Sequence, residues 1–136
     1  MKTDAVKTMK ILIVDDEPHL RTLIQQSLED LEEDGVELFT ASNGEEALET
    51  IREEDPNLVF LDVMMPRKNG FDVCNTVKNE LGLNHIHIIL LTAKGQEFDR
   101  QRGQEVGDDL YMTKPFDPDA LIAKARSVLG LATPGL

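Results

Sequence analysis

The stretch Leu58-Val59-Phe60-Leu61-Asp62-Val63-Met64-Met65-Pro66 decides the fold. Four apolar residues lead into a carboxylate, and a loop that contains Pro66 and Asn69-Gly70 follows. A short apolar run bounded by turn residues is typical of a strand that is buried on both faces. Because ligands of open α/β sheets bind at the carboxyl ends of the strands, Asp62 is the first candidate functional residue.

The rest of the chain repeats this alternation of strand and helix. Continuous apolar runs predict central strands and weaker runs predict edge strands. The other predicted strands lie at 10–15, 36–40, 88–91 and 109–113. Helices are predicted near 18–31, 44–55, 70–81, 97–106 and 117–129. The pattern predicts an α/β domain with a single doubly wound, five-stranded parallel sheet.

A strand order of 2-1-3-4-5 places the three most apolar strands in the centre of the sheet. This is the flavodoxin-like (βα)5 arrangement, and its topological switch point lies between the first and third strands. Those two strands end in Asp15-Asp16 and in Asp62. We therefore expect three carboxylates to meet at one edge of the sheet.

Details of the helices follow from spacing and end signals. The first predicted helix has an apolar stripe that includes Leu20, Leu23 and Ile24. Ser42-Asn43-Gly44-Glu45 has the capping-box pattern at the start of the second helix. The third helix is predicted to bury Leu81 and to end at Gly82. The helix at about 97–106 has few apolar anchors, which predicts low local stability.

Length and composition predict the class of protein. A chain of 136 residues suits one domain, with tails at 1–8 and 131–136 around a domain at 9–130. The formal net charge is −12, which disfavours direct nucleic-acid binding. There is no run of apolar residues long enough to span a bilayer and no signal-peptide pattern. The single cysteine, Cys74, fits a reducing cytosol, so we expect a cytoplasmic protein.

The three predicted carboxylates need a counterion. Two unit charges about 4 Å apart repel by roughly 4 kcal/mol at an effective dielectric near 20. A few carboxylates with open positions suit Mg²⁺, which keeps some water and adds phosphate oxygens to its octahedron. The sequence therefore predicts Mg²⁺ as the cofactor at Asp15, Asp16 and Asp62.

The fourth and fifth predicted strands end in a hydroxyl, Thr92, and in an ammonium, Lys114. A hydroxyl, an ammonium, a metal and carboxylates that face one another suit phosphoryl transfer, in which catalysis is mostly positioning and charge neutralisation. No serine, histidine or cysteine lies at a predicted strand end, so the candidate nucleophile is a carboxylate. Asp62 is the best candidate because it ends the central strand.

In combination, these motifs resemble the receiver domain of two-component response regulators, the CheY-like family. The resemblance covers about 9–129. The motifs that carry it are Asp15-Asp16, Asp62 with Met65-Pro66 and Gly70, Thr92-Ala93, and Lys114-Pro115-Phe116. Each motif alone is weak, but all four occur at the expected strand ends and in the expected order.

The resemblance implies a role for each site residue. Asp62 would accept a phosphoryl group from a phosphohistidine of a sensor histidine kinase or a histidine phosphotransfer protein. Asp16, Asp62 and the backbone carbonyl of Met64 would hold Mg²⁺, with Asp15 acting through water. Lys114 would pair with the phosphoryl oxygens. The Lys114-Pro115 bond resembles the cis peptide of the family.

The resemblance also implies a switch. Thr92 would move to hydrogen-bond the phosphoryl group, and Tyr111 would turn inward behind it. The face made by the helix at 97–106, the fifth strand and the last helix would bind an output partner or a second copy. Met64 and Lys94 would border the path of the hydrolytic water. Because methionine hydrogen-bonds water only weakly, we expect slow loss of the phosphoryl group.

Two other functions stay open at the level of sequence. The chain could be a flavodoxin-like interaction module that is never phosphorylated, although the full set of acids, Thr92 and Lys114 argues against this. It could also be an Mg²⁺-dependent phosphatase with an aspartyl-phosphate intermediate. Such enzymes usually carry a second acid two residues after the nucleophile, and here that position is Met64.

Overall fold

The computed structural model describes residues 8–65, 68–93, 101, 104–105, 107, 109–114 and 117–131. The strands are β1 (Met9–Val14), β2 (Val36–Ala41), β3 (Leu58–Asp62), β4 (His87–Ala93) and β5 (Leu110–Lys114). The helices are α1 (Pro18–Leu28), α2 (Gly44–Glu54), α3 (Gly70–Asn75) and α5 (Pro118–Leu129). A 3₁₀ turn, η1 (Glu29–Asp34), extends α1, and a π turn, η2 (Thr76–Glu80), extends α3.

All five strands form one parallel sheet in the order β2-β1-β3-β4-β5. This confirms the predicted order, with the three most apolar strands in the centre. The register aligns Asp62 at the end of β3 with Leu91 in β4, and Ala93 in β4 with Lys114 at the end of β5. The carboxyl ends of β3, β4 and β5 therefore reach the same edge of the sheet.

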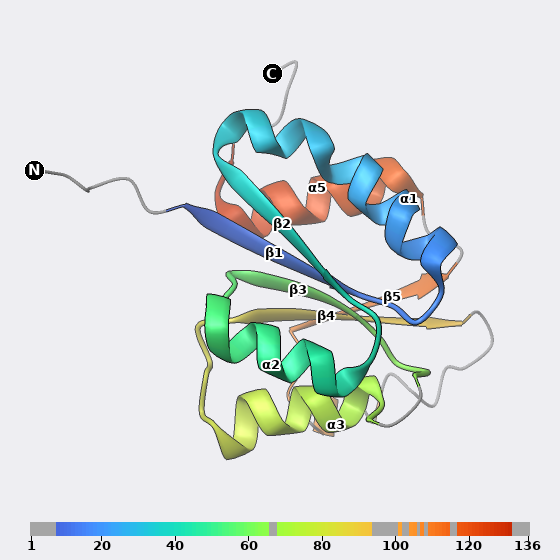
Figure 1. The fold of residues 1–136 in the computed structure, drawn as a ribbon, viewed down its shortest axis with the longest axis vertical. Helices are drawn as coiled ribbons and strands as arrows, with labels where there is room; N and C mark the ends of the chain where they lie inside the picture. The colour runs from blue at the N-terminus through green and yellow to red at the C-terminus, as the bar shows by residue number, and fades with distance from the viewer. Residues whose placement is uncertain are drawn as a thin grey trace, which may run out of the picture.

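Helices cover both faces of the sheet (Figure 1). α1 and α5 pack on one face, and α2 and α3 pack on the other. Residues that alternate along a central strand enter opposite cores, because side chains of a strand point to its two faces in turn. In β1, for example, Ile11 and Ile13 contact the first core while Leu12 and Val14 contact the second. This explains why the central strands are continuous apolar runs.

The apolar stripe of α1 is narrower than its sequence predicts. Ile24 and Leu28 are fully buried, but 41% of Leu23 is exposed. The prediction for Leu23 was therefore wrong. Among the described elements, β1 and α5 pack against this helix, and Ile24 and Leu28 belong to the core that they share.

The cap of α2 begins one residue later than predicted. The N-cap is Asn43, whose side chain accepts a hydrogen bond from the backbone N–H of Glu46 at 2.9 Å. The Glu46 carboxylate in turn accepts from the backbone N–H of Ser42 at 3.0 Å. The reciprocal logic of a capping box is kept, but Asn43 and Glu46 provide it in place of Ser42 and Glu45.

A π turn changes the end of the third helix. The backbone N–H of Leu81 donates to the carbonyl of Thr76 at 2.8 Å, an i to i−5 bond. The extra residue in this turn rotates the following residues out of register with the stripe. As a result 41% of Leu81 is exposed, against the prediction, whereas Gly82 has a positive φ and ends the helix as predicted.

The last helix begins as predicted. Asp117 is its N-cap and accepts from the backbone N–H of Asp119, and Pro118 occupies the first turn. Most of the helix predicted at about 97–106 lies outside the described residues, as do 1–7 and 132–136. Within the part of the chain that the structure describes, no helix is long and apolar enough to cross a membrane.

Candidate phosphoryl-transfer site

Four strands deliver the predicted site residues to one edge of the sheet. Asp15 directly follows β1, Asp62 ends β3, Thr92 is the penultimate residue of β4, and Lys114 ends β5. Asp15 has no exposed surface, and Asp62 and Thr92 are 4% and 1% exposed. Polar side chains so deeply buried at strand ends need partners, since an unpaired buried polar group is costly.

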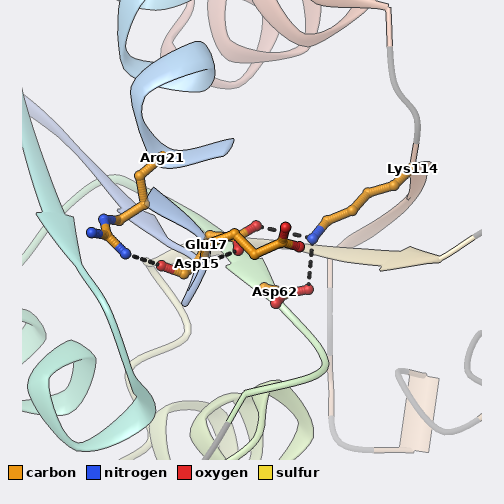
Figure 2. A network of polar contacts seen from close by, with 5 residues as sticks. All are labelled: Asp15, Glu17, Arg21, Asp62 and Lys114. Carbon is orange, nitrogen blue, oxygen red and sulfur yellow. Dashed lines mark hydrogen bonds and ion pairs between the residues drawn. The ribbon is translucent and has the colours of Figure 1, made fainter. Parts of the chain in front are cut away.

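Lys114 joins two of the carboxylates (Figure 2). Its ammonium Nζ lies 2.9 Å from Oδ2 of Asp15 and 3.0 Å from Oδ1 of Asp62. These residues are 99 and 52 positions away from Lys114 in the chain. The parallel sheet order β1-β3-β4-β5 brings them together, so the predicted lysine contacts two of the three predicted acids.

Asp15 is held at every polar atom. Its backbone N–H donates to the carbonyl of Ala41, and its Oδ1 accepts from the backbone N–H of Glu17. Its Oδ2 accepts from Lys114, and its own carbonyl accepts from Nη1 of Arg21 at 2.7 Å (Figure 2). Asp15 is thus a rigid part of the site in which no carboxylate oxygen lacks a partner.

The carboxylate of Asp62, unlike that of Asp15, lies in surroundings that disfavour its negative charge. Burial, and after it the nearby charge of Asp15, raise the pKa of Asp62 to about 6, against the lowering effect of the hydrogen bond from Lys114. Burial of the Lys114 ammonium lowers its pKa, but hydrogen bonds to Asp15 and Asp62 outweigh this and raise it above the usual range. The site thus holds more negative charge than one ammonium neutralises.

A hard cation fits this excess of carboxylates. Asp15, Asp16 and Asp62 each offer an oxygen, and these oxygens all lie within 4.8 Å of one another. Asp16 is exposed, so the cluster opens to solvent on its side. A small oxygen-lined cluster that is open on one side is the donor set that Mg²⁺ prefers in proteins, where it keeps several waters.

The loop after Asp62 passes very close to the site. Gly70, the first residue of α3, donates its N–H to the carbonyl of Val63 at 3.0 Å. A Cβ on Gly70 would collide with the backbone carbonyl of Asp62 and would lie 2.9 Å from Cα of Val63. Two residues after Asp62, Met64 is 70% exposed.

Some predicted residues lie outside the described part of the chain. These are Lys94, Pro66, Pro115, Phe116 and the side chain of Tyr111, whose backbone lies in β5 opposite Leu90. One contact was missed, that of Arg21 with Asp15. Its signal in the sequence is a cation in the first turns of a helix, where the macrodipole disfavours positive charge and a specific partner is expected.

Comparison with known proteins agrees with this geometry. A family model described as the response regulator receiver domain matches residues 11–126, most of the chain. The chain belongs to the response regulator receiver domain family. Fold and site motifs thus identify the same family.

This receiver domain has curated relatives and solved neighbours. It is 48% identical to a probable transcriptional regulator, ycf27, of Pyropia yezoensis, across 88% of this chain and 47% of that protein. It is 32% identical to protein PilG of Pseudomonas aeruginosa, across 93% and 91%. A putative response regulator from Chloroflexus aurantiacus has a TM-score of 0.81 at 31% identity, across 91% and 99%. The chain spans about half the length of the first curated relatives that it matches.

Proposed function

We propose that this receiver domain is a phosphoryl-accepting switch in which Asp62 is the acceptor. The observation that carries the proposal is the bridge from Lys114 to Asp15 and Asp62 at the carboxyl edge of the sheet. A raised pKa indicates a carboxylate that the protein stabilises poorly as an anion. Phosphorylation converts the carboxylate into an acyl phosphate and moves the negative charge onto the phosphoryl oxygens, where the Lys114 ammonium that already contacts Asp62 can neutralise it.

The proposed reaction is an in-line displacement at phosphorus. An oxygen of Asp62 attacks the phosphorus of a phosphohistidine, the P–N bond breaks, and its electron pair returns to the imidazole, which takes up a proton. Lys114 is placed to neutralise the phosphoryl oxygens, because its ammonium already contacts the nucleophile. Thr92, buried at the end of β4, would hydrogen-bond the phosphoryl group once it is attached.

Mg²⁺ is the proposed cofactor. Asp16, Asp62 and the backbone carbonyl of Met64 would hold it, with Asp15 acting through water. When bound, the ion supplies charge neutralisation for the phosphoryl oxygens. The acidic cluster supports this assignment, since its oxygens lie within 4.8 Å of one another and outnumber the single contacting ammonium.

The proposed phosphoryl donor is a sensor histidine kinase or a histidine phosphotransfer protein. The proposed output surface combines the segment at 97–106 with β5 and α5, and it would bind a partner or a second copy of the chain. Thr92 and Tyr111 are the proposed switch residues. They lie in β4 and β5, the strands that join the site to this surface, which supports the proposal.

Intact mass after incubation with acetyl phosphate and Mg²⁺ tests the acceptor. We expect a gain of one phosphoryl unit on the native chain and none on Asp62→Ala. The matched control is Asp72→Asn, which removes an exposed carboxylate on α3 and should label like the native chain. Labelling that survives in Asp62→Ala would mean that another carboxylate is the acceptor. No labelling, together with no Mg²⁺ binding, would favour an interaction module that is not phosphorylated.

A further inference from the structure

Arg21 makes an unusual contact for a residue near the start of a helix. From α1 it reaches back six positions and donates from Nη1 to the backbone carbonyl of Asp15 at 2.7 Å (Figure 2). Guanidinium groups more often meet carboxylates, which they bind in pairs of hydrogen bonds. Here the carboxylate oxygens of Asp15 are already taken by Glu17 and Lys114, so Arg21 binds the main chain instead.

We infer that Arg21 is a positioning residue for the metal, because it sets the peptide unit that carries Asp16. This inference rests on the proposed function of the site. The carbonyl of Asp15 and the N–H and Cα of Asp16 belong to one planar peptide unit. A hydrogen bond that fixes that carbonyl oxygen therefore fixes the direction in which the Cα of Asp16 leaves the end of β1.

Asp16 depends on this contact because it has no other anchor among the described residues. Its side chain is exposed, and its carboxylate accepts no hydrogen bond from any described residue. Asp15, in contrast, is held by its own side chain and by the carbonyl of Ala41. Since Asp15 is rigid, the torsions between Asp15 and Asp16 decide where the carboxylate of Asp16 lies, and Arg21 restrains them.

Positioning of Asp16 and simple charge repulsion by Arg21 have opposite effects on Mg²⁺ affinity. Arg21 places a positive charge against the main chain of Asp15, one of the three clustered acids, so its charge alone repels a divalent cation. If charge were its whole effect, replacement by a neutral residue would strengthen Mg²⁺ binding. If Arg21 positions Asp16, the same replacement weakens binding, because groups that orient metal ligands usually contribute about tenfold or more to affinity.

Calorimetric titration of the purified chain with Mg²⁺ separates the two effects. The variants are Arg21→Gln, which removes the charge and the contact, and Arg21→Lys, which keeps the charge but loses the planar fork. The matched control is Arg52→Gln, which removes one positive charge from the exposed last turn of α2. Thermal unfolding without metal shows whether each variant is folded, and the amide ¹⁵N shift of Asp16 reports the neighbouring carbonyl directly.

We expect Mg²⁺ binding about tenfold weaker in Arg21→Gln, an intermediate loss in Arg21→Lys, and no loss in Arg52→Gln. The amide shift of Asp16 should change in both Arg21 variants before metal is added. Unchanged or tighter binding by Arg21→Gln would overturn the inference while leaving the proposed function intact. If Arg21→Gln does not fold, native affinity in Arg21→Lys would overturn it equally. A native chain that binds no Mg²⁺ would overturn the proposed metal site and this inference together.

Discussion

At the scale of single residues, the buried charge of Asp62 has a measurable cost. The folded chain binds a proton at Asp62 with a pKa of about 6, against 3.8 ordinarily. The folded state therefore holds this proton more tightly than the unfolded state, and stability falls as the pH rises from about 4 to about 6. Above about pH 6 the charged Asp62 lowers the free energy of unfolding by its full amount, which is on the order of 3 kcal/mol at 1.36 kcal/mol for each pKa unit.

We predict that Asp62→Asn is more stable than the native chain at pH 7.5 without Mg²⁺. The amide can still accept a hydrogen bond from Lys114 but carries no charge to bury. The gain in unfolding free energy should be smaller at pH 5, where most native chains are already protonated at Asp62. Urea unfolding at both pH values, in the presence of a chelator, measures it. A gain that does not depend on pH, or that also appears in Asp72→Asn, would contradict the assigned cause.

Met64 offers a second prediction at this scale. Its side chain is 70% exposed beside Asp62, and a thioether hydrogen-bonds water only weakly. In Met64→Asn, an amide in the same place can hold and orient a water molecule, so we expect the phosphorylated form to lose its phosphoryl group faster. The decay of the phosphorylated mass after removal of acetyl phosphate gives the rate. Met64→Leu, which keeps an apolar side chain, should decay like the native chain, and an unchanged rate in Met64→Asn would refute the idea.

Gly70 is the subject of a third prediction at the scale of residues, because the structure has no room for a side chain there. A Cβ at this position would meet the backbone of Asp62 and Val63. We predict that Gly70→Ala moves the end of β3 and slows phosphorylation by acetyl phosphate, since small misplacements of reacting groups are costly. Gly82→Ala is a control for glycine loss with nothing near its Cβ, although its positive φ makes it less stable. Equal phosphorylation rates in Gly70→Ala and the native chain would contradict the prediction and show that the loop accommodates a Cβ without moving Asp62.

At the scale of elements, an ion pair with a buried lysine joins η2 to the start of β5. Nζ of Lys78 lies 2.7 Å from Oδ2 of Asp109 and donates to the carbonyl of Ile86 at 2.6 Å. The same Asp109 oxygen accepts from the backbone N–H of Ile88 at 2.8 Å, and the N–H of Asp109 donates back to Ile88. One acid thus holds the π turn, the start of β4 and the approach to β5 together.

We predict that replacing Asp109 lowers the unfolding free energy more than replacing Lys78. The side chain of Lys78 is 6% exposed, whereas that of Asp109 is 27% exposed. Asp109→Asn leaves a buried ammonium without its counterion and should lower the unfolding free energy by about 2 kcal/mol or more. Lys78→Met leaves an acid that water can reach, so the loss should be smaller. Urea unfolding of both variants and of the double variant measures the coupling, and equal losses would contradict this reading.

At the scale of the whole molecule, the proposed binding of Mg²⁺ to the acidic cluster would be coupled to folding. The site exists only when β1, β3 and β5 are assembled, so an ion that binds it stabilises the folded chain. At a free Mg²⁺ concentration of 100 times the Kd, the gain in unfolding free energy is about 2.7 kcal/mol. We predict this gain for the native chain, measured by thermal unfolding against NaCl of equal ionic strength. Asp16→Asn should lose most of it, and an equal gain in that variant would exclude Asp16 as a ligand.

Local patterns in the sequence determined the elements and their order. The apolar runs at 11–14, 58–61 and 88–91 predicted central strands correctly, because the middle of a strand that is covered on both faces meets only apolar surroundings. With the strand order known, the acids and Lys114 had to meet at one sheet edge, because parallel strands end on the same side. Asp15, Asp62 and Lys114 could therefore be placed before any coordinates were known.

Only the tertiary structure decided what each element packs against. Leu23 and Leu81 follow the helical stripe in sequence but are each 41% exposed, and a π turn rotates Leu81 away from the stripe. Arg21 and Lys78 look like ordinary surface cations, yet their partners are a carbonyl six residues back and an acid 31 positions on. Periodicity along a chain reports the spacing of residues. The partner of a side chain depends on distances between elements, which exist only in the folded molecule.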